Sequence, residues 1–150
     1  MRFTVFAFAP ETSVSPASRD FRPGDSFRAW SAGCASGEEP YSLAILVADF
    51  LGPRVADCDL KIYATEVDEE ALNAARRGEY SPERLRRVKP EWRQKYLHGT
   101  TTLRVNREIR RMIIFGRSNL AVDAPISHCS LVLCRNVLIY FNTATQKRIL

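Results

Sequence analysis

Two adjacent glutamates, Glu38 and Glu39, stand at the start of an apolar segment that runs from residue 40 to residue 51. The segment has helical spacing, and the start of a helix normally attracts phosphate through its free N–H groups and its dipole. Carboxylates in this place would repel a phosphate and attract an ammonium or sulfonium group. The pair therefore predicts a site for a cationic ligand without phosphate.

Other polar side chains follow apolar runs that read as buried strands. In open parallel sheets, ligands bind beyond the carboxyl ends of the strands, so these residues should share one edge. Gly33, Glu38 and Glu39 follow the run at 27–32, and Glu66 follows the run at 60–65. Asn119 and Leu120 come after the run at 111–115, and Arg135 and Asn136 follow the run at 131–134.

The chemistry of this edge suits a nucleoside. A glycine turn lets backbone approach a ligand closely, and an acid that ends the second strand is the usual partner of ribose hydroxyls. The turn lacks both the G-x-G-x-x-G spacing of dinucleotide sites and the G-K-[ST] step of phosphate loops. S-adenosyl-L-methionine is an adenosine derivative that carries positive charge and no phosphate.

Each residue also has a structural interpretation. Ser36 and Glu39 have the spacing of a capping box, in which the acid would only cap the helix. Glu66 is also consistent with a surface acid at a strand end. Asn119 and Asn136 are common turn formers. The joint arrangement favours the ligand site.

The elements that must position these residues alternate between strand and helix. Strands are expected at 27–32, 60–65, 111–115 and 131–134, with a largely buried helix up to Gly52-Pro53 and a second helix from an Asp68 cap to Gly78. Residues 81–111 predict helices near 82–96 and a strand at 101–105. Continuously apolar strands indicate a parallel sheet covered on both sides, hence an α/β fold.

Composition and charge narrow the class of protein. The 150 residues suffice for one domain: residues 1–26 predict a loop or disordered leader, and residues 27–150 the folded domain. Four cysteines without C-x-x-C pairing and only two histidines predict reduced thiols, no metal site and a cytoplasmic location. No run is long enough to cross a membrane, so we expect no membrane insertion.

Positive charge is concentrated in one stretch. Residues 76–111 hold twelve Arg or Lys and four Asp or Glu, a local net charge of +8. We call this stretch the basic band. It favours an acidic partner, which is a nucleic acid, an anionic surface or a carboxylate-bearing protein, although a solvated helix face would have the same composition.

Four motifs together resemble the CheR-type chemotaxis receptor methyltransferase family, in that family's order and spacing. They extend from about Arg28 to Leu150 and read WSAGCASGEEPYSLAI, KIYATEVDEEALNAARRGEY, FGRSNL and LVLCRNVLIYFNTATQ. The resemblance implies a Rossmann-like S-adenosyl-L-methionine-dependent methyltransferase fold, with residues 27–150 as a partial CheR-type methyltransferase domain. It also implies methyl-ester formation on glutamate side chains in the cytoplasmic helices of chemoreceptors.

The resemblance also implies roles for individual residues. By motif, the cofactor would be bound by Gly33, Glu39, Glu66, Asn119, Leu120, Arg135 and Asn136, and Tyr140 would face the transfer site. The family more often has Asp at position 66, so ribose contact by the longer Glu66 needs a small adjustment. Tyr140 would orient the substrate carboxylate, or else pack on the core at a strand edge.

Several features of that family are expected to be missing. We find neither its helical amino-terminal domain nor its T-x-FFR-type segment, and the later strands, the PGG turn and the inserted β-subdomain are expected beyond Leu150. The chain is therefore expected to be truncated at both ends, with doubtful turnover. The alternative function is a non-catalytic cofactor- or partner-binding module. A nucleic-acid methyltransferase is disfavoured because no N-P-P-Y motif or Pro-Cys nucleophile is present, so no nucleic-acid partner is expected.

Overall fold

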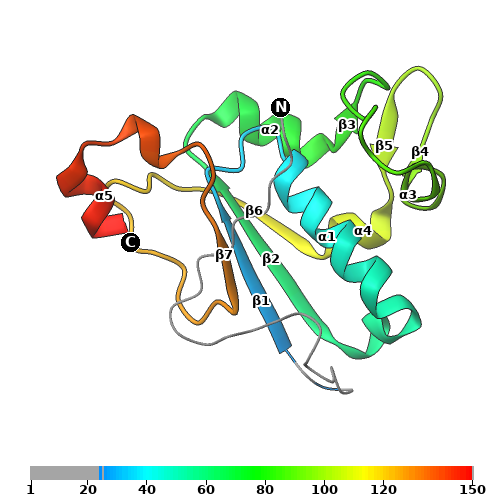
Figure 1. The fold of residues 1–150 in the computed structure, drawn as a ribbon, viewed down its shortest axis with the longest axis horizontal. Helices are drawn as coiled ribbons and strands as arrows, with labels where there is room; N and C mark the ends of the chain where they lie inside the picture. Colours follow the sequence, from blue (N-terminus) through cyan, green and yellow to red (C-terminus); the bar gives the residue numbers. More distant parts are fainter. Residues whose placement is uncertain (1–23, 25, 150) are drawn as a thin grey trace.

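A four-stranded parallel sheet forms the centre of the protein, as seen in a computed structural model that describes residue 24 and residues 26–149. The expected leader at 1–26 lies outside the described residues except for Gly24 and Ser26. The strand order β6-β2-β1-β7 reverses at β1, as in doubly wound α/β sheets (Figure 1). The strands are β1 (Ser26–Ala32), β2 (Asp59–Glu66), β6 (Ile113–Arg117) and β7 (Leu131–Leu133).

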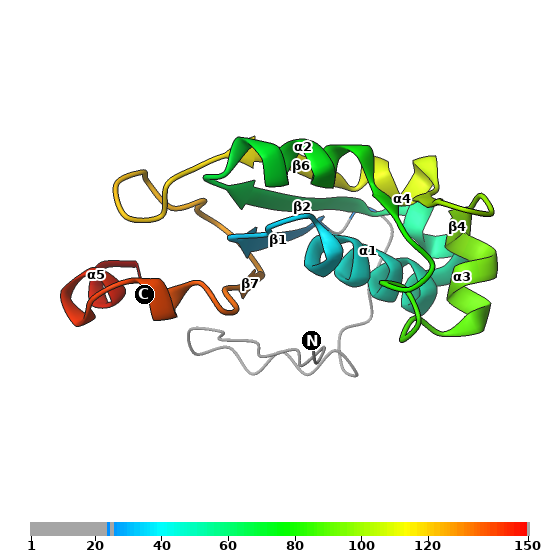
Figure 2. The same ribbon diagram turned by 90° about the horizontal axis from the view of Figure 1, so that it is seen from above.

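The connections place the helices on one face of this sheet. The main helices are α1 (Glu38–Leu51), which continues into the 3-10 turn η1 (Gly52–Asp57), α2 (Glu69–Arg77) and the short α4 (Arg107–Arg111). Figure 2 shows α1 and α2 lying along the strands. The core between the sheet and these helices contains the fully buried residues Ile62 of β2, Leu72 of α2 and Ile109 of α4, and the ring centroid of Tyr41 lies 5.7 Å from that of Phe115.

The ends of the helices agree with the sequence. Asp68 caps α2 by accepting hydrogen bonds from the backbone N–H groups of Glu70 and Ala71, and Gly78 ends it in the left-handed region. In α1 the side chains of Tyr41, Ala44 and Ala48 are buried, but Leu46 and Phe50 are about half exposed, so this helix is less buried than predicted.

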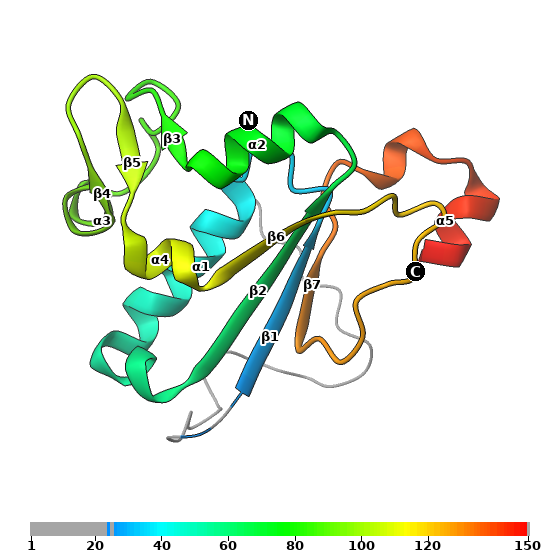
Figure 3. The same cartoon turned by 180° about the vertical axis from the view of Figure 1, so that it is seen from behind.

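The opposite face of the sheet carries Trp30, Tyr63 and Ile114, which the parallel register aligns in one row. Trp30 is buried and its indole N–H donates to Thr65 Oγ1, whereas Ile114 is 44% exposed. Among the described helices, α1, α2 and α4 contact β2 or β6 from the other side (Figure 3). Within the described residues, the predicted helices are therefore confirmed on one face of the sheet.

A second, antiparallel sheet is inserted between α2 and α4. It has the order β3-β5-β4, and its strands are β3 (Glu79–Tyr80), β4 (Leu97–His98) and β5 (Leu103–Val105), with α3 (Pro90–Tyr96) preceding β4. Asp49 of α1 ties α3 to the main body by accepting hydrogen bonds from Trp92 Nε1 and Tyr96 Oη. The expectation that an inserted β-sheet would lie only beyond Leu150 is wrong.

The end of the described chain leaves the sheet. After β7 come the 3-10 turn η2 (Leu138–Tyr140) and α5 (Thr143–Ile149), which lies beside the sheet in Figure 1. None of the described helices is long and apolar enough to cross a membrane.

Candidate cofactor-binding site

The glycine turn after β1 uses its own backbone donors. The N–H groups of Gly33 and Cys34 both donate to the carbonyl oxygen of Thr65, at 2.8 and 2.9 Å, and the N–H of Ala35 donates to Glu66 Oε2 at 2.8 Å. A phosphate-binding loop needs such N–H groups free to point at the ligand. Three donors that a phosphate cradle would use are therefore already bonded within the protein.

The two glutamates at the start of α1 have different surroundings. Glu38 forms an ion pair with Arg84 and accepts a hydrogen bond from Ser36 Oγ at 2.7 Å. Glu39 Oε1 accepts one from Ser31 Oγ at 2.7 Å, and no hydrogen bond within the described part of the chain reaches its Oε2. Glu38 is therefore neutralised by the protein, whereas Glu39 keeps acceptor capacity.

The surroundings of Glu39 also shift its acidity. Partial burial raises its pKa above the ordinary 4.5, while the hydrogen bond from Ser31 and the charge of Arg135 act in the opposite direction. A half-buried carboxylate with one unused oxygen can bind a cationic group strongly, because little water competes for it.

The capping-box interpretation of Glu39 is wrong. Helix α1 begins at Glu38, and its N-cap is Gly37, which has a φ of 91° and makes no side-chain cap. Ser36 bonds to Glu38 instead, and Glu39 turns toward β1. Because Glu39 does not cap the helix, the ligand-site interpretation gains support.

Glu66 lies at the same turn, but its carboxylate is already engaged. Oε1 accepts from the backbone N–H groups of Val67 and Asp68, and Oε2 accepts from that of Ala35. The extra methylene lets the side chain fold back onto its own loop. A carboxylate has about four lone-pair sites, so a ribose hydroxyl can still be accepted. The ribose role of Glu66 stays a prediction.

The buried thiol of Cys34 lies close to the predicted cofactor acids. Burial, followed by the charge of Glu66 and then those of Glu39 and Glu38, raises the pKa of the Cys34 thiol to about 12. Both predicted cofactor acids are therefore near one sulfur atom. The thiol is neutral at physiological pH, which excludes it as a nucleophile.

The residues after β7 meet the glycine turn from the other side. Asn136 has a φ of 56°, and the next residue, Val137, packs directly on Gly33. A Cβ atom on Gly33 would lie 2.2 Å from Val137 Cγ2. This contact and the charge of Arg135 on Glu39 bring the predicted residues of β1 and β7 together.

The residues after β6 are placed next to Glu66. The N–H of Ser118 donates to the carbonyl oxygen of Glu66, and Asn119 Oδ1 accepts from the N–H of Ala121, so Asn119 forms the turn that was its structural interpretation. Leu120 and Trp30 line a cavity of about 340 Å³ together with neighbouring residues of this loop. The adenine role of Asn119 and Leu120 stays a prediction.

Tyr140 lies in η2 and is 80% exposed. Its alternative interpretation, packing on the core at a strand edge, is wrong. An exposed hydroxyl is available to a substrate, and the catalytic role of Tyr140 stays a prediction.

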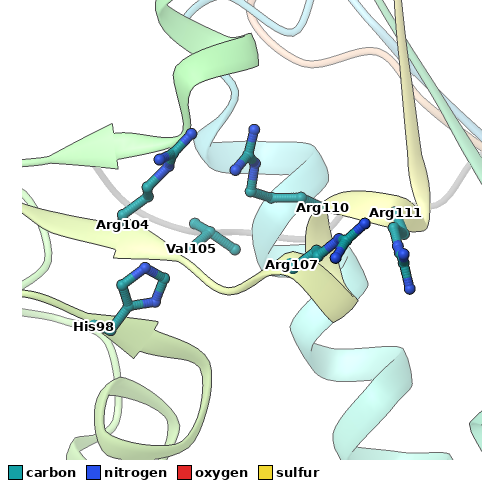
Figure 4. A pocket seen from close by; sticks show the side chains of 6 residues that line it. All are labelled: His98, Arg104, Val105, Arg107, Arg110 and Arg111. Carbon is teal, nitrogen blue, oxygen red and sulfur yellow. The ribbon is translucent and has the colours of Figure 1, made fainter.

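A basic cavity of about 480 Å³ lies away from this edge, between the small sheet and α4 (Figure 4). Arg104 has a buried Nε that finds no hydrogen-bond partner in the described chain. The side chains of Arg104 and Arg110 point the same way in this view, while those of Arg107 and Arg111 point in other directions. The cavity is lined by His98, Arg104, Val105, Arg107, Arg110 and Arg111. It concentrates the charge of the basic band at one place.

Sequence reasoning missed three residues that shape the turn. Ser31 bonds to Glu39, Arg84 pairs with Glu38, and Tyr80 Oη donates to the carbonyl oxygen of Ser36 at 2.7 Å. Arg84 and Tyr80 are more than 40 positions from their partners, so no local pattern indicates them. Ser31 left a signal, because it is a polar residue at an inward position of an apolar strand.

Comparison with known proteins gives consistent matches. A family model described as CheR methyltransferase, SAM binding domain, matches residues 4–150, so the likeness begins well before Arg28. A probable chemotaxis protein methyltransferase of Rhizobium etli is 37% identical over 134 residues, which cover 85% of this chain and 50% of that protein. The chemotaxis protein methyltransferase of Escherichia coli K12 is 37% identical over 139 residues, covering 86% and 47%.

A longer relative occurs in Rhodobacter capsulatus, described as an uncharacterized 104.1 kDa protein in the hypE 3' region. It is 35% identical over 148 residues, which cover 97% of this chain and 15% of that protein. The chain thus spans about half the length of the two methyltransferases and a smaller share of this larger protein.

Proposed function

The chain belongs to the CheR methyltransferase family, and from this membership we propose that it binds S-adenosyl-L-methionine at the carboxyl edge of its main sheet and serves in protein-glutamate O-methylation. The observation that carries the proposal is the half-buried carboxylate of Glu39, one oxygen of which accepts no hydrogen bond within the described chain. It lies beside a turn in which the N–H groups of Gly33, Cys34 and Ala35 are bonded internally. Such an edge accepts a cationic nucleoside and repels a phosphorylated one.

The residues present fit the cofactor. Glu39 would hold the ammonium of its methionine part, and Arg135 would balance the carboxylate of that part. Glu66 has acceptor capacity left for the ribose, and the turn at Asn119 and Leu120 would border the adenine. Asn136 would face the ligand from the loop that packs on Gly33.

The transfer step needs positioning rather than a base. The substrate glutamate, with a pKa of about 4.3, is already a carboxylate at neutral pH. When bound, the cofactor would supply a sulfonium methyl group, and its transfer to a carboxylate oxygen of the substrate would leave the neutral thioether. Alignment of such reactants lowers a barrier by roughly 7–11 kcal/mol. Tyr140 would orient the attacking carboxylate through its exposed hydroxyl.

The partner would be the glutamate-bearing helices of a chemoreceptor cytoplasmic domain, and the protein would act in the cytoplasm, where these helices lie. The basic cavity supports an acidic partner, since within the described chain the side chains of Arg107 and Arg111 form no hydrogen bond or ion pair. We expect the double variant Arg107→Glu/Arg111→Glu to bind a receptor cytoplasmic domain roughly tenfold more weakly at low salt, and less so at high salt.

Arg54→Glu/Arg86→Glu is the charge-matched control for this binding experiment, because both residues lie away from the cavity and bond only to backbone carbonyls. Equal losses in the two variants would reject a specific docking surface. Binding of an oligonucleotide in competition with the receptor would favour the nucleic-acid interpretation instead.

The activity is tested with methyl-labelled cofactor and a receptor cytoplasmic domain. We expect label in the receptor that is released by base as methanol, since a methyl ester is hydrolysed while methylated nitrogen is stable. Label should be lost when Glu39 or Asn136 is replaced. Cofactor binding without any base-labile label would overturn the transferase proposal and support the non-catalytic binding module.

A further inference from the structure

Ser31 is a fully buried hydroxyl residue near the carboxyl end of β1. It lies on the helix-covered face of the sheet, in register with Ala64 of β2 and two positions from Ala29, and both alanines are fully buried. Burying a hydroxyl is unfavourable unless it is hydrogen-bonded. The bond that it makes goes to Glu39 Oε1, at 2.7 Å.

We propose that Ser31 is a positioning residue for the cofactor, because it fixes one carboxylate oxygen of Glu39 against β1 and leaves the other for the ammonium group of the ligand. The inference rests on the proposed function of Glu39. The inference differs from the proposed function because it assigns the orientation of the Glu39 carboxylate to Ser31, a strand residue that would not contact the ligand.

The geometry explains why a strand residue is suited to this task. Glu39 lies in the first turn of α1, its side chain has three rotatable bonds, and it takes no part in capping the helix. Ser31 has a single rotor on a strand that is hydrogen-bonded to neighbours on both sides. A short bond from a rigid donor therefore restricts the carboxylate more than a bond from a mobile surface side chain would.

Every element around Glu39 contributes a titratable or charged group. The turn contributes Cys34, and the end of β7 contributes Cys134 and Arg135, while Glu66 at the end of β2 acts on the shared Cys34 thiol. Burial raises the pKa of Glu39, and the Ser31 hydrogen bond lowers it, more than Arg135 does. Ser31 thus helps to keep the carboxylate ionised, in addition to aiming it.

The test compares Ser31→Ala with the wild-type chain by titration calorimetry with S-adenosylhomocysteine between pH 5 and pH 8.5. We expect about fivefold to twentyfold weaker binding at pH 7, in line with the loss of a hydrogen bond to a charged group. We also expect the loss of binding on acidification to begin at a higher pH, because the pKa of Glu39 rises. Ser42→Ala is the matched control, since that hydroxyl on α1 donates only to the carbonyl oxygen of Glu38.

Two further measurements separate positioning from a general structural role. In the Glu39→Gln background, Ser31→Ala should have little additional effect on affinity. A carbon-13 titration of the ligand-free chain should show a higher Glu39 midpoint in Ser31→Ala. A loss of affinity that is uniform over pH, or that persists in full without Glu39, would overturn the inference.

The failure of the inference and that of the proposed function give different results. If wild-type protein binds S-adenosylhomocysteine and Ser31→Ala binds it equally well at every pH, Ser31 is not a positioning residue. If the folded wild-type chain does not bind this ligand at all, the cofactor proposal itself is overturned, and the role of Ser31 with it.

Discussion

Replacing Glu39 with glutamine is expected to weaken S-adenosylhomocysteine binding by about 10- to 100-fold and to leave the folded chain at least as stable at neutral pH. The loss of affinity follows from removing a charged acceptor for the ligand's ammonium group. Glutamine retains the size of the side chain, and its amide oxygen can still accept from Ser31. Titration calorimetry and thermal unfolding measure the two effects.

The effect on stability has a defined dependence on pH. Because the pKa of Glu39 is raised in the folded state, the folded chain binds the proton of the Glu39 carboxyl group more tightly than the unfolded chain does. The group therefore stabilises the fold below the ordinary pKa of 4.5, and this contribution is lost as the pH rises through the folded pKa. The melting temperature of Glu39→Gln relative to wild type should thus increase from pH 4 to pH 7.5.

Glu38 supplies the control, because it has the same chemistry one position earlier. Its carboxylate is paired with Arg84, so Glu38→Gln should change ligand affinity within about threefold, as is typical of surface ion pairs. Equal losses of affinity in the two variants would mean that the edge acts only through total charge. Unchanged affinity in Glu39→Gln would remove Glu39 from the site.

The second large effect is expected from Gly33→Ala, which should destabilise the fold by about 2–4 kcal/mol and abolish ligand binding. Gly33 has a φ of 69°, which is unfavourable for alanine, and the new methyl group would lie 2.2 Å from Val137 Cγ2. Relief requires Val137 to move, and Asn136 precedes it in the chain. Chemical denaturation and calorimetry check both outcomes.

Two variants separate the steric from the conformational cost at Gly33. Gly52→Ala also has a positive φ, of 56°, with a ψ of −133°, but no atom lies within 4 Å of the added methyl group, so it should show the conformational cost alone, about 1–3 kcal/mol. Adding Val137→Ala to Gly33→Ala should restore part of the stability by making room. If this double variant is no more stable than Gly33→Ala alone, the contact between the two loops is not the cause.

The main sheet and its flanking helices could be predicted because their signals are local. Continuous apolar runs marked the four parallel strands, and Asp68 and Gly78 marked α2 through cap chemistry that involves only neighbouring residues. The common edge of the site followed from the geometry of parallel strands. The prediction for α1 was less accurate, since apolar residues such as Phe50 do not reveal whether a neighbour covers them.

Of the small sheet only β5 could be predicted, as the strand at 101–105, because β3 and β4 have two residues each, too few to repeat an alternating pattern. The capping box misled for a related reason. Ser36 and Glu39 had the right spacing, but Gly37, in the left-handed conformation, is the N-cap, so the helix begins one residue later. The Glu39 carboxylate accepts a hydrogen bond from Ser31 instead. Contacts such as that between Arg84 and Glu38 depend on tertiary structure alone.

The central claim is that this edge accepts a cationic, phosphate-free nucleoside, and a ligand series in one calorimetry experiment tests it most directly. The series consists of S-adenosyl-L-methionine, S-adenosylhomocysteine, methylthioadenosine, which lacks both the ammonium and the carboxylate of the amino-acid part, and ATP. We predict binding of the first two below about 1 mM, weaker binding of the third, and none of ATP. ATP binding as tight as that of S-adenosyl-L-methionine would contradict the claim.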